Sequence, residues 1–181
     1  MAANTYSLIA SQTLATTAAS ITFSGIPSTY NDLVLRCSMR GDRAVVNGFD
    51  LSLKFNGDAT TTFYSETSLY CNLMTTGTLT STNNANAAFV GQKTIINNST
   101  SLADTYTIME MYFPKYNATG NKPFYITSIQ ENNVFTNSNV VHSTEACTYR
   151  GTSGISSFIL SNTLANFTAT SSFHLYGIKN S

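Results

Sequence analysis

The clearest strand pattern in the chain is LVLRCSMR, residues Leu33–Arg40. Its odd-numbered positions are apolar, and polar side chains stand at most of the positions between them. This period of two predicts a β-strand with one apolar face. The alternation recurs in FDLSLKF, residues Phe49–Phe55, and Asn56-Gly57-Asp58 follows it as a turn, because Asn and Gly tolerate positive backbone dihedrals. We expect a strand around Thr62–Tyr70 to return antiparallel and complete a meander.

Similar strand patterns occupy much of the remaining chain. Pro114 ends the apolar run Tyr106–Phe113, since proline cannot donate to a strand ladder, and the polar loop Lys115–Lys122 predicts a hairpin with the next strand. The predicted strands beyond the meander are Tyr6–Ala10, Ser20–Phe23, Tyr106–Phe113, Phe124–Ile129, Glu145–Arg150, Ile155–Leu160 and Ser172–Ile178.

Strands without helical patterns predict an all-β fold. We expect residues 1–181 to form a single-domain antiparallel β-sandwich, with a jelly roll as the first choice and an immunoglobulin-like Greek-key sandwich as the alternative. The alternative lacks a Trp and a suitably placed Cys pair. The Thr- and Asn-rich segment at about 71–103 is expected to be an excursion across the surface, with room for short strands.

The chain is poor in charge. Asp, Glu, Lys and Arg make up 10% of the residues, against about 25% in an average soluble protein. Ser, Thr and Asn take their place, with 22, 28 and 19 residues. Nine basic and nine acidic residues cancel, so the sequence predicts neither a nucleic acid nor an anionic membrane as partner. No Lys or Arg precedes Arg36, which argues against a secretory signal and predicts a protein made in the cytoplasm.

Few residues offer catalytic chemistry. Gly151–Gly154 does not have the spacing of a nucleophile elbow, and the two histidines, His142 and His174, lie in strand patterns. The three cysteines form no zinc motif and are expected in the core. A polysaccharide-cleaving enzyme would need two nearby carboxylates, for which Glu110 and Glu131 are the pair to test. We expect no enzyme, no cofactor and no metal.

Two charged features remain. Glu110 interrupts an apolar strand, so it is expected on the solvent face or paired with a basic group across strands. Arg36, Arg40 and Arg43 form the one basic concentration, and the first two are an even number of positions apart on one strand. They indicate either a solvated sheet face, with Lys54 or Asp50 as cross-strand neighbours, or a contact patch for an acidic protein surface.

Five stretches carry a family resemblance. They are Ser7–Leu14, Ala19–Pro27, Tyr30–Arg36, Phe55–Asp58 and Phe173–Lys179. In these stretches the chain resembles small β-rich virion structural proteins of tailed bacteriophages, and the likeness is weak between Cys71 and Ala103.

The resemblance implies a homo-oligomer, expected to be a trimer, on the surface of the virion. There it would act as a capsid decoration (cement) protein that braces neighbouring copies of the major capsid protein. The alternative is a tail-associated adhesin that binds a host glycan through Tyr-rich loops such as Tyr112–Tyr125. The expected partner contacts are Asn4, Tyr6, Arg36, Arg40, Arg43 and Tyr116.

Overall fold

The structure is a computed structural model that describes residues 5–44, 51–60, 62–72, 78–87, 90–91, 94–131, 141–162 and 164–179. For residues 71–72 and 78–87 it describes the backbone alone. The described residues form strands and no helix, as the β-rich composition predicts. The strands are β1 (Tyr6–Thr13), β2 (Ser20–Phe23), β3 (Asp32–Met39), β4 (Leu51–Phe55), β5 (Tyr64–Asn72), β6 (Thr78–Ala87), β7 (Thr107–Pro114), β8 (Lys122–Gln130), β9 (Val141–Tyr149), β10 (Phe158–Asn162) and β11 (Ser172–Ile178).

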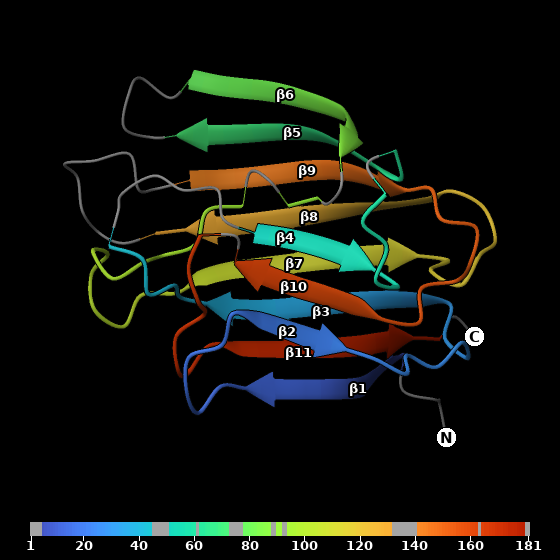
Figure 1. The fold of residues 1–181 in the computed structure, drawn as a ribbon, viewed down its shortest axis with the longest axis horizontal. Helices are drawn as coiled ribbons and strands as arrows, with labels where there is room; N and C mark the ends of the chain where they lie inside the picture. Colours follow the sequence, from blue (N-terminus) through green and yellow to red (C-terminus); the bar gives the residue numbers. More distant parts are fainter. Residues whose placement is uncertain are drawn as a thin grey trace.

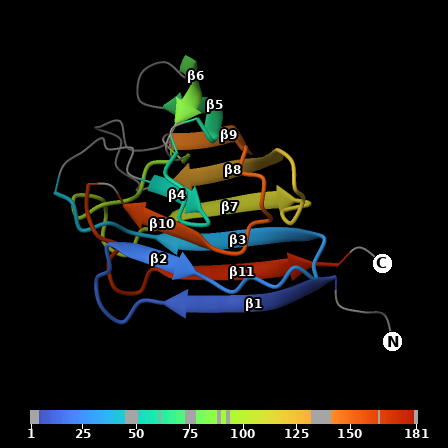
Figure 2. The ribbon, with the colours of Figure 1, turned by 45° about the vertical axis from the view of Figure 1, so that its right-hand side comes forward.

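The strands form two antiparallel sheets of unequal size. One has eight strands in the order β1-β11-β3-β7-β8-β9-β5-β6, and the other has three in the order β2-β10-β4. In Figures 1 and 2 the small sheet lies over the middle of the large one, while β5 and β6 continue beyond it. The chain passes repeatedly between the sheets, because β2, β4 and β10 are each followed by a strand of the large sheet. The prediction of an all-β antiparallel sandwich is confirmed.

The predicted meander is wrong, although its strands exist. The strand after LVLRCSMR, β4, pairs with β10 in the small sheet, whereas β5 pairs with β6 and β9 in the large one. Asn56 and Gly57 do form a turn with positive φ, of 51° and 71°. The Asn56 side-chain nitrogen Nδ2 donates to the Gly154 carbonyl, and its side-chain oxygen accepts from the Ser156 and Ser157 backbone amides. The turn therefore leads from one sheet to the other.

The predicted hairpin at Pro114 is confirmed, since β7 and β8 pair antiparallel. Proline is the last residue of β7 and lies two positions past Tyr112, where the pairing with β8 ends. Two of the predicted core cysteines, Cys37 and Cys147, are buried and free. The side chain of Cys71 lies outside the described residues.

Aromatic rings fill the core between the sheets. Phe55 of β4 lies at the centre of these contacts, with its ring centroid 5.0 to 6.5 Å from five other rings. The neighbours come from both sheets and are Tyr64, Phe113, Phe124, Tyr149 and Phe158. The Tyr64 hydroxyl accepts from the Phe55 amide and donates to the Asp58 carbonyl, both at 2.9 Å, so this buried polar group is satisfied.

The predicted surface excursion, which allowed for short strands, is wrong for the described residues between Val90 and Asn98. Residues 78–87 form β6, which pairs with β5 at the end of the large sheet. Further on, the described residues between Val90 and Asn98 are buried, and Val90 forms a bridge with Leu53 of β4. Apolar residues such as Ile96 face the interior there, in a stretch that composition marks as polar. This segment covers part of the large sheet that the small sheet leaves open.

Candidate interaction surface

The two faces of the large sheet have different environments. Alternate residues of β7, β8 and β9 are buried on the inner face, where they meet the small sheet and residues 90–98. No described element covers the opposite side, which we call the open face. Six of the eight large hydrophobic residues that are exposed among the described residues lie on it, with exposures from 39% for Tyr125 to 62% for Ile108. The six are Tyr6, Leu8, Leu69, Ile108, Tyr125 and Ile129.

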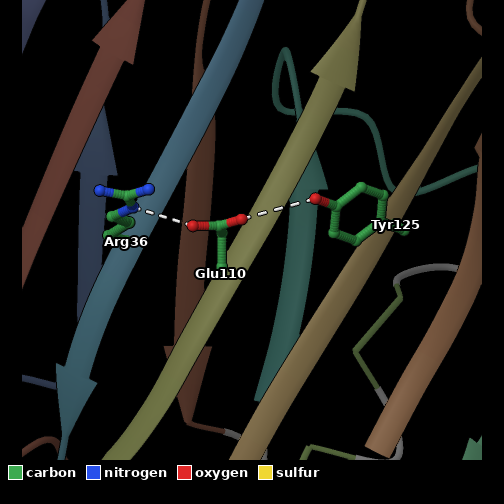
Figure 3. Close-up of polar contacts among 3 residues, drawn as sticks. All are labelled: Arg36, Glu110 and Tyr125. Atoms are coloured by element: carbon green, nitrogen blue, oxygen red, sulfur yellow. Dashed lines mark hydrogen bonds and ion pairs between the residues drawn. The ribbon is translucent and has the colours of Figure 1, made fainter. Parts of the chain in front are cut away.

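An ion pair lies near the middle of the open face (Figure 3). Arg36 of β3 and Glu110 of β7 are directly opposite in the strand register, and Arg36 Nε donates to Glu110 Oε2 at 2.8 Å. The hydroxyl of Tyr125 on β8 donates to the other carboxylate oxygen at 3.4 Å. The hydrogen bond with Glu110 raises the pKa of the Arg36 guanidinium, while partial burial opposes the shift. The expectation that Glu110 pairs with a basic group across strands is confirmed, and the partner is Arg36.

Tyrosines surround this pair. The rings of Tyr112 and Tyr125 stack with centroids 5.8 Å apart, and those of Tyr6 and Tyr176 meet edge to face at 6.4 Å. The Arg36 guanidinium lies 6.0 Å from the centre of the Tyr6 ring. The Tyr112 hydroxyl donates to Asp32 Oδ2 at 2.8 Å, and this hydrogen bond, together with burial and the charge of Asp32, raises the pKa of Tyr112 to about 12.

Tyr112 and Tyr125, the ends of the expected Tyr-rich loop, therefore lie in strands β7 and β8. Tyr116, which does lie in that loop, is buried, and its hydroxyl donates to the Pro27 carbonyl. Tyr116 was predicted as a partner contact, and burial makes that prediction wrong. An aromatic residue beside a turn gives no sequence signal that separates an inward from an outward orientation.

The three arginines do not form one patch. Arg36 lies on the open face, but Arg40 lies just past β3 and donates to the main-chain carbonyls of Ser101, Leu102 and Thr105. Arg43 is half-buried, and its carbonyl accepts from the amide and hydroxyl of Ser99. Arg40 thus anchors the loop before β7 and lies apart from Arg36, and its predicted partner contact stays a prediction.

Two further sequence predictions concern neighbours on this face. Lys54, expected beside Arg36, lies on β4 and pairs with Ile159 in the small sheet, so that prediction is wrong. Asp50, the other neighbour expected for the arginines, and Asn4, predicted as a partner contact, lie outside the described residues. Tyr6 and Arg36 are the predicted contacts that the structure brings together.

The open face also has a hollow of about 270 Å³ beside the ion pair. Strands β3, β7 and β11 supply its walls, among them Ser38, Ile108 and His174. His174 Nδ1 and the Ser11 hydroxyl are 2.9 Å apart, so this histidine is held in a cross-strand hydrogen bond. The hollow lacks the enclosure typical of a small-molecule site.

Acidic groups gather on the inner face as well. One carboxylate oxygen each of Glu66 and Glu145 and the Sγ of Cys147 lie within 4.8 Å of one another, and all three residues are buried. Glu66 accepts hydrogen bonds from the Ser68 hydroxyl and the Gly91 amide, and Glu145 accepts from the Thr94 hydroxyl at 2.9 Å. Burial raises the pKa of the Cys147 thiol well above its usual value, and the two carboxylates add to the shift. These contacts fix Gly91 and Thr94 on the sheet.

A second hollow, of about 470 Å³, lies at one end of the sandwich. It is lined by the Asn56–Asp58 turn, Phe63, Tyr149 and the Gly151–Gly154 loop. Its polar side chains hold the loops together: Asn56 bonds to residues 154–157, and Asp58 accepts from the Thr60 amide. These hydrogen bonds hold the Asn56–Asp58 turn, after which the chain passes from the small sheet to the large one.

The carboxylate pair named for a hydrolase is not assembled. Glu110 pairs with Thr127 of β8, and Glu131 lies four positions farther along the chain, one residue past the end of that strand. At ~3.3 Å per residue the two are roughly 13 Å apart along the sheet. Glycosidase carboxylates lie about 5 to 9.5 Å apart, so Glu110 and Glu131 do not have this arrangement.

Comparison with family models finds no match, and a search of curated proteins finds no relative. Among the residues that the structure describes, no helix has the length and apolarity of a membrane span.

Proposed function

We propose that the protein is a non-enzymatic structural protein of a phage virion, and that it decorates the capsid and braces neighbouring capsid subunits. The observation that carries the proposal is the open face, a broad sheet surface with exposed Tyr, Leu and Ile side chains around one ion pair. Monomeric proteins rarely expose apolar patches of more than a few hundred Å², and larger ones indicate interaction surfaces. The resemblance to phage structural proteins supplies the virion setting.

The composition of the face supports a protein partner. Stable interfaces are enriched in aromatic residues and Arg and depleted in Lys and Glu at their centre. Tyr6, Tyr125 and Arg36 fit this pattern. Because Arg36 is already paired with Glu110, a partner would not bury an isolated charge, which is the costly case.

The alternative is a tail-associated adhesin. The stacked Tyr112 and Tyr125 rings favour it, since aromatic rings with hydroxyl groups suit a sugar ring. Its surface would be the same open face, and not the loop between the two tyrosines.

Copy number in purified particles separates the two functions. A decoration protein is expected in proportion to the major capsid protein, as measured by quantitative mass spectrometry, and on the capsid shell in a cryo-electron microscopy map. A few copies at the tail, with binding of the isolated protein to host glycans, would reject decoration and support the adhesin.

A further inference from the structure

The open face has the features of a surface that packs on a copy of itself. We propose that two chains associate face to face through it, about a two-fold axis that runs parallel to the strands between β3 and β7. This inference rests on the view, taken from the proposed function, that the open face is an assembly surface. It assigns that face to a second copy of the chain, so that the dimer meets capsid subunits through its remaining surface.

Charge complementarity is the first argument. Arg36 and Glu110 lie side by side on the two central strands, and they are oppositely charged. Rotation about the proposed axis places β3 of one copy over β7 of the other. Arg36 of each copy then faces Glu110 of the other, and the two ion pairs become a square of alternating charges. A charged partner of one sign would instead meet a repelling group.

The neighbouring rows give the second argument. The same axis places β11 over β8 and β1 over β9, because the sheet order is β1-β11-β3-β7-β8-β9. In the row next to the ion pair, the register aligns Leu8, Tyr176, Val34, Tyr112, Tyr125 and Ala146 across the sheet. Tyr176 of one copy therefore meets Tyr125 of the other, and Leu8 meets Ala146. The second copy covers the exposed members of this apolar and aromatic row, while Val34 is already buried within each chain.

The area of the face is the third argument. Six strands at ~4.8 Å spacing, each about eight residues long at ~3.3 Å per residue, span about 750 Å². A standard stable interface buries about 800 Å² per partner, so the face is of the required size. Stacked sheets pack about 10 Å apart, a distance that side chains of Tyr and Leu fill.

A two-fold contact uses the same patch on both chains, whereas a trimer needs two different complementary patches. The described residues offer one such patch. The inference therefore replaces the trimer expected from the sequence with a dimer as the unit of assembly.

Charge reversal tests the geometry directly. In Arg36→Glu each proposed dimer brings four acidic groups together, and in Glu110→Arg it brings four basic groups together. Each variant alone is expected to weaken association at least tenfold. A mixture of the two is expected to associate, since every Glu of one chain then faces an Arg of the other. Sedimentation velocity of the full chain reports the mass, which is 19.6 kDa for the monomer.

A pair of apolar variants provides the matched control. Ile108→Glu places a charge on the open face, and Leu164→Glu places one at a similarly exposed leucine just after β10 of the small sheet. The first is expected to dissociate the dimer and the second to leave it intact. Urea unfolding of each variant at low concentration checks that the monomers fold equally well.

Several outcomes would overturn the inference: a monomer at 100 µM, a trimer, mixed charge variants that stay apart, or a dimer unaffected by Ile108→Glu. A particle map with the open face against another protein would do so too. Failure of the proposed function is distinguishable, because a protein that dimerises as described but is absent from purified particles leaves the inference standing and removes the decoration role.

Discussion

Gly177 lies in the C-terminal strand where the ring of Tyr30 packs against the backbone, and a Cβ at this position would overlap that ring. The close approach explains why the chain has a glycine near the end of strand β11, where the lack of a side chain otherwise weakens a strand. We expect Gly177→Ala to lower the free energy of unfolding by about 1–3 kcal/mol, the usual cost of overpacking. Urea unfolding measures the change.

Gly120 provides the control for this substitution, since a Cβ there meets nothing within 4 Å. Gly120→Ala is expected to leave stability within about 0.5 kcal/mol of the wild type, as for other unconstrained surface changes. Tyr30→Ala introduced into Gly177→Ala should relieve the overlap and show non-additive energies. Equal stabilities of Gly177→Ala and Gly120→Ala would mean that the Tyr30 ring moves aside without cost.

At the same scale, the sequence marks Glu110 as unusual but does not identify its partner. A carboxylate in an apolar strand must reach solvent or a cation, which is a local rule. The identity of the cation depends on the β3–β7 register, and the two residues are 74 positions apart in the chain. Alternation also places Tyr6 and Arg36 at outward positions, while the burial of Tyr116 depends on how a loop folds back on Pro27.

At the scale of elements, residues 90–98 depend on buried hydrogen bonds to the inner face of β5 and β9. Thr94 is fully buried and donates to Glu145 at 2.9 Å. Thr94→Val keeps the shape but removes the donor, so the buried carboxylate loses a hydrogen bond. We expect a loss of about 1–3 kcal/mol in the free energy of unfolding, and faster hydrogen exchange at the Val90 and Gly91 amides.

Thr22→Val is the matched control, because Thr22 lies on the exposed side of β2 and its side chain has no buried partner to lose. Its stability and its exchange rates at residues 90–91 are expected to match those of the wild type. If Thr94→Val behaved in the same way, the segment would be held by its apolar contacts alone.

Strand positions follow from the sequence more readily than strand partners do. The predicted ranges fall on β1 to β5 and β7 to β11, because a period of two and the turn residues are local features. Asn56 and Gly57 predict a turn correctly, but a two-residue turn does not say which sheet the next strand joins. β6 was missed as a defined strand because its sequence TLTSTNNANA has no apolar alternation. Backbone pairing with β5 holds β6 in the sheet, and this pairing does not depend on apolar alternation.

At the scale of the whole molecule, we expect folding stability to depend on pH mainly in the alkaline range, because the chain has few charged groups and many tyrosines. Hydrogen bonding to Asp32 and burial raise the pKa of Tyr112 from 10.0 to about 12. Burial also raises the pKa of Tyr149, and it raises the pKa of Tyr64 well above the usual value. The folded state therefore keeps these phenols protonated where the unfolded chain ionises them. The stabilisation is fully present below pH 10 and is lost as the pH rises through the folded values. We expect the urea midpoint to fall steadily from pH 10 to pH 12.

Tyr112→Phe separates this effect from a simple loss of contact. The variant lacks the hydrogen bond to Asp32 at every pH, so at pH 7 it is expected to be somewhat less stable than the wild type. It cannot ionise, however, and its midpoint should fall less steeply than that of the wild type between pH 10 and pH 12. Phenolate absorbance recorded along the same pH series follows ionisation independently of unfolding. Parallel slopes for the two proteins would show that Tyr112 does not contribute to the alkaline transition.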